Sequence, residues 1–205
     1  HASIANSVEE RAKSKGWEVI QMTAGVDAEK QADQLENLIA LGVDAILLTP
    51  VDSKAICTAV AKAVEAGIPV YGIDRSTDGY PLNMTVQADN AMAGRQAAEG
   101  IIEFLNDKYG KVEGTVLELQ GDMASNVAQL RNEGFMDVMS AYSNVEIISK
   151  PTDWDQDKFY KNTLDVVGAR EIDAIFSHTD VIGTTPILSA LDQLGKKTKV
   201  GAADH

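Results

Sequence analysis

Hydrophobic positions occur in short continuous runs along this chain, and helix-length amphipathic segments separate most of these runs. Continuous apolar runs of this length are typical of strands that are covered on both faces. The predicted strands are WEVIQM (17–22), VDAILLTP (43–50), IPVYGID (68–74), GTVLELQG (114–121), VEIISK (145–150), DAIFSHT (173–179) and KVGAAD (199–204). A steady alternation of strands and helices predicts an α/β fold, with parallel sheets and helices on both faces.

The helix pattern is clearest between residues 27 and 42. The apolar positions that fall on one face of this helix are Ala28, Ala32, Leu35, Leu38 and Ile39. Asp27 is expected to cap its N-terminus, and Gly42 to end it. Asp52 stands in the same position before the next helix, SKAICTAVAKAVEAG.

The two halves of the chain carry the same succession of patterns. WEVI, DAEK and VDAI in the first half return as VEII, DQDK and IDAI, with an offset that drifts only from 128 to 129 residues. Any two strand–helix units resemble one another to some degree, but the constant order favours a true repeat. The sequence therefore predicts two tandem lobes, residues 1–110 and 111–205, divided at the polar stretch NDKYGKVEG.

Two further expectations concern the completeness of these lobes. The segment YPLNMTVQAD (80–89) is predicted as an additional strand of the first lobe. The first lobe has no strand before its opening helix, ASIANSVEERAKSKG, and the second lobe stops at the end of a strand. Because a parallel lobe normally opens with a strand, we expect sequence to be missing at both ends.

Composition narrows the class of protein. The 205 residues are 44% hydrophobic and 24% charged, with a net charge of −13, which is ordinary globular composition. This negative charge repels phosphate backbones, so we expect no nucleic-acid partner. No window approaches about 18 uninterrupted apolar residues, so no direct membrane insertion is expected. Cys57 is the single cysteine, which excludes an internal disulfide.

Polar side chains at the strand ends are the candidate chemistry. In open parallel sheets, ligands bind beyond the carboxyl ends of the strands. Asp74 and Arg75 follow one such run, and Trp154 follows another. A carboxylate accepts hydrogen bonds and a guanidinium donates them, so the pair matches neighbouring hydroxyls of a sugar or polyol, and an indole adds an apolar plate for a sugar ring. The alternatives are a strand-end ion pair and a loop aromatic that anchors the surface.

Motifs for other chemistries are absent from the sequence. His1, His178 and His205 lack metal-ligand spacing, and there is no GxxxxGK[ST] or GxGxxG loop for phosphate. No GxSxG nucleophile motif occurs either. We therefore expect no metal, no cofactor and no enzyme activity. The alternative is an enzyme on a flavodoxin-like fold.

Specific stretches resemble a known family. GVDAILLTPVDSKAICTAVAKAVEAGIPVYGIDR is similar to the first lobe of the ribose-binding-protein-like periplasmic sugar-binding proteins. VLELQGDMASNVAQLRNEGF is similar to the start of their second lobe. The resemblance runs through essentially the whole chain, while the family's first strand and C-terminal part have no counterpart. It implies the type I periplasmic binding protein fold, with two tandem Rossmann-like lobes built on doubly wound parallel sheets.

The resemblance also implies a ligand-binding set. Asp74 and Arg75 match the pair that hydrogen-bonds sugar hydroxyls, and Trp154 matches an aromatic that packs on the sugar ring. The complete implied set is Asp74, Arg75, Gln129, Trp154, Thr179, Asp204 and His1.

Three members of this set depart from the family pattern, and His1 agrees with it. Gln129 stands where many relatives carry arginine, and Thr179 where they often carry asparagine. Asp204 lies one residue later than the family's ligand-binding acid. His1 aligns with an aromatic of the first helix that also contacts ligand.

In function, the resemblance implies a substrate-binding protein that closes its lobes around a monosaccharide or polyol and passes it to an ABC transporter permease. A chemoreceptor or sensor kinase is a further implied partner. We expect a monomer in the periplasm or on the extracytoplasmic surface, its signal peptide removed, or a lipoprotein in a Gram-positive cell. The alternative is the effector-binding core of a lac-repressor-type transcription regulator, which has a helix-turn-helix upstream.

Overall fold

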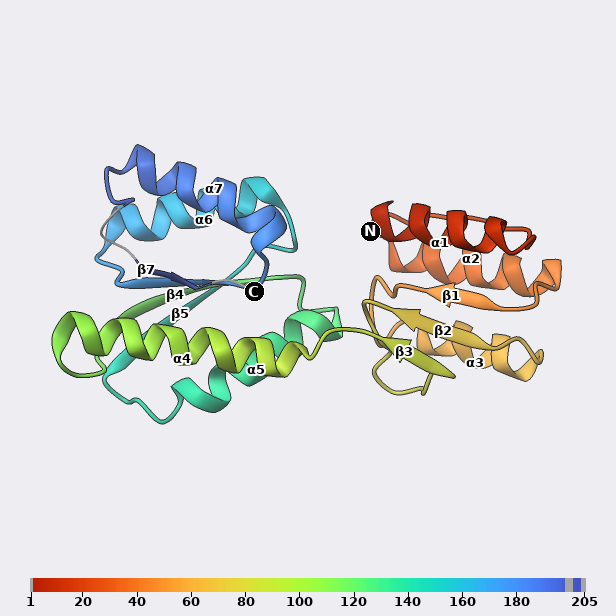
Figure 1. Cartoon of the computed structure of the whole chain (residues 1–205), viewed down its shortest axis with the longest axis horizontal. Helices are drawn as coiled ribbons and strands as arrows, with labels where there is room; N and C mark the ends of the chain where they lie inside the picture. Colours follow the sequence, from red (N-terminus) through yellow and green to blue (C-terminus); the bar gives the residue numbers. More distant parts are fainter. Residues whose placement is uncertain (1, 198–200, 204–205) are drawn as a thin grey trace.

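The computed structural model describes residues 2–197 and 201–203. Two parallel sheets, each flanked by helices, lie side by side along the long axis of the molecule (Figure 1). This arrangement confirms the α/β class with two lobes. His1 and Asp204, two of the predicted ligand residues, lie outside the described residues.

The first sheet has three parallel strands in the order β1–β2–β3. Its elements are α1 (Ala2–Ser14), α2 (Ala28–Leu41), β1 (Ile46–Leu48), α3 (Cys57–Glu65), β2 (Val70–Ile73) and β3 (Met84–Val86). Strand β3 confirms the additional strand expected within residues 80–89. The buried core cluster of this lobe is on one face, while Leu47, Met84 and Val86 on the other face are 56%, 56% and 61% exposed.

The predicted helix caps are found, with one difference. Asp27 accepts the backbone N–H of Lys30 at 2.9 Å, and Gly42 ends α2 in a left-handed conformation with φ of 67°. Asp52 accepts the N–H groups two and three residues later, both at 2.8 Å. It therefore caps the turn before α3, which itself begins at Cys57.

One predicted strand does not form. Residues 17–22 belong to no ladder, and Trp17 is 65% exposed. A strand is stable only when a neighbour pairs with its backbone, and these residues have no such neighbour in the described chain. The segment that follows β1 is bonded by Gln31, whose side chain donates to the carbonyl of Thr49 at 2.9 Å and accepts from the N–H of Val51 at 2.8 Å.

The second sheet has four parallel strands in the order β5–β4–β6–β7. Its strands are β4 (Gly114–Gln120), β5 (Val145–Pro151), β6 (Ala174–Ser177) and β7 (Gly201–Ala203). Its helices are α4 (Asn90–Tyr109), α5 (Asn126–Met139), α6 (Gln156–Ala169) and α7 (Asp180–Gln193). Helices α4 and α5 cover one face of this sheet, and α6 and α7 cover the other (Figure 1). Each pair of helices packs over its own cluster of buried residues.

Helix α4 shares its core with the second sheet. Its buried residues Ile101 and Leu105 join the cluster that contains Val116 of β4 and Phe135 of α5. The boundary expected between residues 110 and 111 stays a prediction, and the packing of α4 favours a division on its N-terminal side instead. None of the helices in the described part of the chain is both long and apolar enough to cross a membrane.

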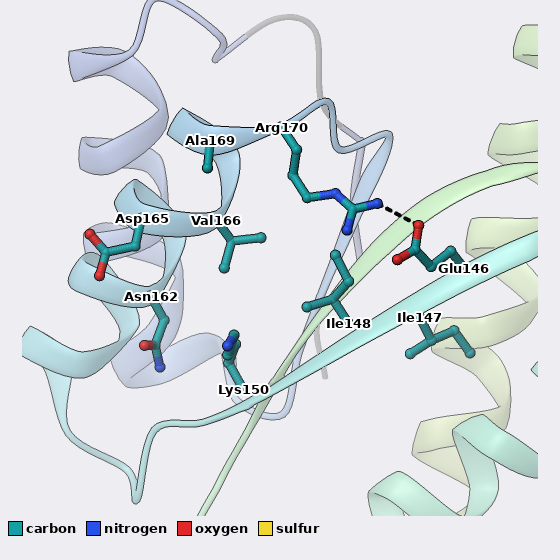
Figure 2. A pocket seen from close by; sticks show the side chains of 9 residues that line it. All are labelled: Glu146, Ile147, Ile148, Lys150, Asn162, Asp165, Val166, Ala169 and Arg170. Carbon is teal, nitrogen blue, oxygen red and sulfur yellow. Dashed lines mark hydrogen bonds and ion pairs between the residues drawn. The ribbon is translucent and has the colours of Figure 1, made fainter.

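An open hollow of about 590 Å³ lies between β5 and α6 (Figure 2). Arg170 and Glu146 form an ion pair within it. Its lining also includes Ile148 and Val166, and it contains none of the predicted ligand-binding residues.

Candidate functional site

Asp74 and Arg75 lie directly after β2, at the carboxyl end of the first sheet. Asp74 has a left-handed backbone with φ of 67°, which aspartate adopts more readily than most residues. Its N–H donates to the carbonyl of Val86 at 2.8 Å. Arg75 is 9% exposed, and its Nη1 donates to the carbonyl of Pro50 at 3.1 Å. The pair is thus fixed to the backbone at the ends of both neighbouring strands.

Arg75 also contacts the second lobe. Its guanidinium carbon lies 5.9 Å from the centroid of the Trp154 ring, which is within the range of a cation–π contact. Burial lowers the pKa of Arg75 below its ordinary value, while the carboxylates of Asp74 and Asp122 act in the opposite direction. Because Asp122 follows β4 and Trp154 follows β5, the cation is surrounded by groups from both lobes.

Trp154 is held in place by a glycine and by its own backbone. A Cβ on Gly121 would lie 2.1 Å from Cη2 of the indole, so only glycine lets the ring lie against the end of β4. Asp153 and Trp154 are both left-handed, with φ of 53° and 60°. Strained backbone of this kind is concentrated at functional sites. Within the described residues, the buried Nε1 of Trp154 has no hydrogen-bond partner.

Gln129 lies on the helix that follows β4, and Thr179 lies directly before the helix that follows β6. Gln129 is half-buried, and its Nε2 donates to the carbonyl of Met123 at 2.8 Å, which fastens the loop after β4. Thr179 precedes α7, and its side chain makes no capping hydrogen bond. Ser177 donates its hydroxyl to the carbonyl of Thr179 at 2.8 Å. Thr179 therefore offers a hydroxyl at the carboxyl end of β6.

Asn126, the first residue of α5, joins the lobes beside this group. Its N–H donates to Oγ of Ser53 at 3.0 Å and its Nδ2 to Oε1 of Gln87 at 3.2 Å. Its Oδ1 accepts the N–H of Ser76 at 3.1 Å. Ser53, Ser76 and Gln87 all belong to the first lobe, and both Asn126 and Ser53 are buried. This joint places the Asp74–Arg75 turn against the start of α5.

Chemically, these groups are able to bind a neutral polyhydroxy ligand. The arrangement combines a carboxylate acceptor, a guanidinium fork, a hydroxyl and an indole ring, all at the carboxyl ends of strands. No group of three or more His, Cys, Asp or Glu side chains within residues 2–197 and 201–203 is arranged to hold a metal ion.

Comparison with known proteins decides the family. The sequence profile described as "Periplasmic binding protein domain" matches residues 2–204. The chain belongs to the periplasmic binding protein family.

Three similar proteins place this periplasmic binding protein among its relatives. The ribose import binding protein of Bacillus subtilis is 35% identical over 198 residues, which cover 95% of this chain and 62% of that protein. A xylitol-binding protein of Mycolicibacterium smegmatis is 29% identical, with 90% of this chain and 52% of that protein covered. The chain thus spans less than two thirds of the length of both. A solved solute-binding protein of Actinobacillus succinogenes with bound D-allose has a TM-score of 0.83 and 28% identity, over 98% of this chain and 72% of that one.

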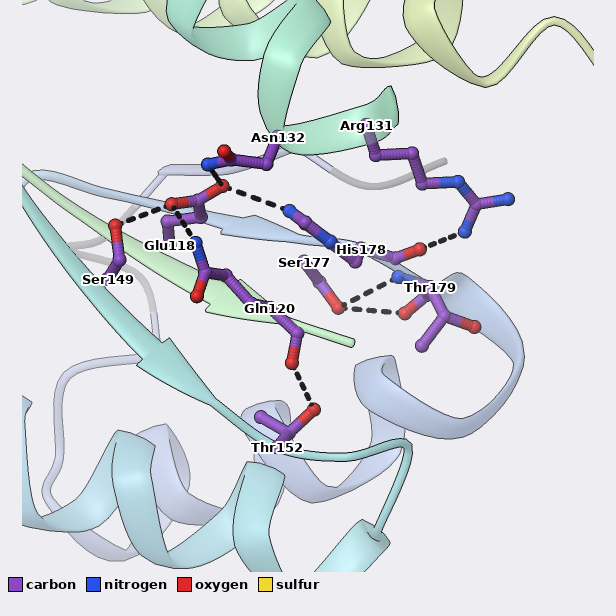
Figure 3. Close-up of polar contacts among 9 residues, drawn as sticks. All are labelled: Glu118, Gln120, Arg131, Asn132, Ser149, Thr152, Ser177, His178 and Thr179. Carbon is purple, nitrogen blue, oxygen red and sulfur yellow. Dashed lines mark hydrogen bonds and ion pairs between the residues drawn. The ribbon is translucent and has the colours of Figure 1, made fainter. Parts of the chain in front are cut away.

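The structure adds Arg131 to the candidate site of this periplasmic binding protein. Its Nε donates to Oδ1 of Asn90 at 3.0 Å, and its Nη1 donates to the backbone carbonyl of His178 (Figure 3). Burial lowers the pKa of Arg131, while Asp74 and Asp180 act in the opposite direction. The carboxylate of Asp74 therefore acts electrostatically on two arginines, one from each lobe. Arg131 begins the RNEGF stretch (131–135), one of the stretches most typical of the family. Its contacts with Asn90 and His178 lie on other elements and become visible only in the structure.

Proposed function

We propose that this chain captures a monosaccharide or polyol between its two lobes and delivers it to an ABC transporter on the extracytoplasmic side of the membrane. The observation that carries the proposal is the position of Arg75 of the first lobe, 5.9 Å from the ring of Trp154 in the second. Each lobe supplies part of one polar and aromatic set. A ligand that contacts both parts therefore stabilises the closed arrangement of the lobes.

The relatives support the ligand class. Their names and structures refer to ribose, xylitol and D-allose, which are neutral polyhydroxy compounds of similar size. They are described as binding proteins, so we propose binding rather than catalysis for this chain. The proposed contacts are Asp74, Arg75, Gln129, Trp154 and Thr179, and Asp204 and His1 stay predictions.

The test is isothermal titration calorimetry of the purified chain with D-ribose, xylitol and D-allose. We expect at least one of these, or a related sugar or polyol, to bind with one-to-one stoichiometry and a Kd below about 1 mM. A phosphorylated sugar is the negative control. It should not bind, because the acidic residues around the site repel the two negative charges of its phosphate. The absence of binding heat with every neutral sugar at millimolar concentration would contradict the proposal.

A further inference from the structure

A fully buried acid lies beneath the second lobe's part of the proposed site. Glu118 extends from β4 toward α5, and its side chain is 0% exposed. Its carboxylate accepts hydrogen bonds from Nε2 of His178 at 3.0 Å, Nδ2 of Asn132 at 2.9 Å, Oγ of Ser149 at 2.5 Å and Nε2 of Gln120 at 3.0 Å (Figure 3). These donors come from α5, from β4 and β5, and from the residue after β6. One carboxylate therefore links three strand segments to a helix.

The pair formed by Glu118 and His178 is costly to bury. Burial acts to raise the pKa of Glu118, but hydrogen bonds from His178, Asn132 and Ser149 outweigh it and leave the pKa below its ordinary value. Because an ionised carboxylate only accepts, His178 presents an N–H at Nε2. Its Nδ1 is buried and has no hydrogen-bond partner in the described part of the chain. Apolar side chains stabilise a core better than a buried acid and imidazole, so stability alone does not explain the pair.

Arg131 is connected to this pair at two points. Its Nη1 donates to the backbone carbonyl of His178, and Asn132, the next residue on α5, donates to Glu118. Figure 3 shows Glu118 between the His178 ring and Asn132, with Arg131 on the same helix as Asn132. The head of Arg131 and the helical turn that carries it are thus both fixed through one carboxylate.

We propose that Glu118 and His178 are positioning residues for Arg131, whose guanidinium belongs to the proposed ligand site. The proposal rests on the proposed sugar-binding function. Glu118 holds the ring of His178, the residue whose backbone carbonyl receives Arg131. It also fixes the middle of α5 through Asn132. Neither member of the pair touches the ligand.

The first test compares ligand affinity between variants by calorimetry, with D-ribose, xylitol and D-allose as probes. Glu118→Gln keeps the shape but turns one acceptor oxygen into a donor that faces other donors, so affinity should fall about tenfold or more. His178→Gln keeps an amide donor for Glu118, so affinity should stay within about threefold. Adding Glu118→Gln to Arg131→Ala should cause no further loss, because the two act through one group.

The matched control is Asp173→Asn. Asp173 precedes β6 at the end opposite His178, and its carboxylate accepts from Nζ of Lys108 at 2.6 Å. This variant should lower the melting temperature and leave affinity unchanged. An unchanged affinity in Glu118→Gln, or an additive loss in the double variant, would overturn the positioning role.

A second readout needs no ligand. The ¹⁵N–¹H signal of Arg131 Nε, assigned by its loss in Arg131→Ala, should exchange slowly with water in the wild-type chain. It should broaden or disappear in Glu118→Gln and persist in Asp173→Asn. A wild-type chain that binds no probe contradicts the proposed function, whereas an Arg131 signal that is the same in Glu118→Gln overturns the positioning pair.

Discussion

Arg75 is the side chain on which ligand capture depends most, because it is anchored in one lobe and contacts the other. Its Nη1 is bonded to Pro50, and its guanidinium faces Trp154. A surface ion pair would be solvated and would contribute little, but Arg75 is only 9% exposed. Its burial at the meeting point of the lobes favours a binding role over a strand-end salt bridge.

Replacement of this side chain gives the first prediction. Arg75→Ala should weaken sugar affinity by about tenfold to a hundredfold, because hydrogen bonds to a charged donor contribute about 1.5–3 kcal/mol each. Arg75→Lys keeps the charge but not the planar fork, so it should bind with intermediate affinity. Calorimetry measures both variants, and thermal melting verifies their folding. An unchanged affinity in Arg75→Ala would return the pair to a strand-end salt bridge.

Helices α4 and α5 approach each other through glycines. A Cβ on Gly94 would lie 2.1 Å from the carbonyl oxygen of Arg131, and one on Gly134 would lie 2.0 Å from that of Ala91. Backbone atoms cannot move aside as a side chain does. The spacing of these two helices therefore sets the position of Arg131.

Two glycines of α4 provide a matched pair of variants. Gly94→Ala should force the helices apart and lower stability by about 1–3 kcal/mol, and it should also weaken ligand affinity. Gly100→Ala, where an added Cβ meets nothing within 4 Å, should raise stability by about 0.5–1 kcal/mol through helix propensity. Urea unfolding measures both. Equal effects in the two variants would contradict the close packing of α4 on α5.

The hydrogen bonds to the carboxylate of Asp173 make the stability of the folded chain depend on pH. Burial acts to raise the pKa of Asp173, but hydrogen bonds from Lys108, Tyr109 and the backbone of Thr115 leave it below its ordinary value. As pH falls, the carboxylate of Asp173 is therefore protonated at a higher pH in the unfolded chain than in the folded chain. The stabilisation is complete above about pH 4 and is lost as pH falls through the folded pKa.

Urea unfolding between pH 7 and pH 3 measures this effect. Stability should fall more steeply with acid in the wild-type chain than in Asp173→Asn, which no longer has the titrating carboxyl group. Parallel curves would show that Asp173 contributes nothing to the acid sensitivity.

The pattern of apolar runs predicts the strands and helices well where each strand has a neighbour. It fails at residues 17–22, because pairing depends on what lies beside a strand and not on its own sequence. The sequence predicts the candidate site at the carboxyl ends of strands, as for Asp74 and Trp154. The reason is that parallel strands bring these ends to the same edge of their sheet. Glu118 could have been noticed as a charge inside an apolar strand. Its partners on other elements become visible only in three dimensions.

The joint at Asn126 links the two lobes of the molecule. Asn126→Ala removes the two side-chain hydrogen bonds to Ser76 and Gln87. We expect this variant to favour more open arrangements, with a larger radius of gyration by small-angle X-ray scattering and several-fold weaker sugar binding. Asn162→Ala is the control, because Asn162 donates to Pro151 within the second lobe alone. Scattering from Asn126→Ala that matches the wild type would contradict the joint.

The most direct measurement of ligand capture between the lobes is tryptophan fluorescence. The chain has two tryptophans, and Trp17 is 65% exposed, outside the candidate site. A Trp17→Phe variant leaves Trp154 as the sole reporter. Titration of this variant with the sugar that binds by calorimetry should give a saturable change in emission at the same Kd, and adding Arg75→Ala should weaken that response. Binding heat with no change in Trp154 emission would contradict a ligand site between the lobes.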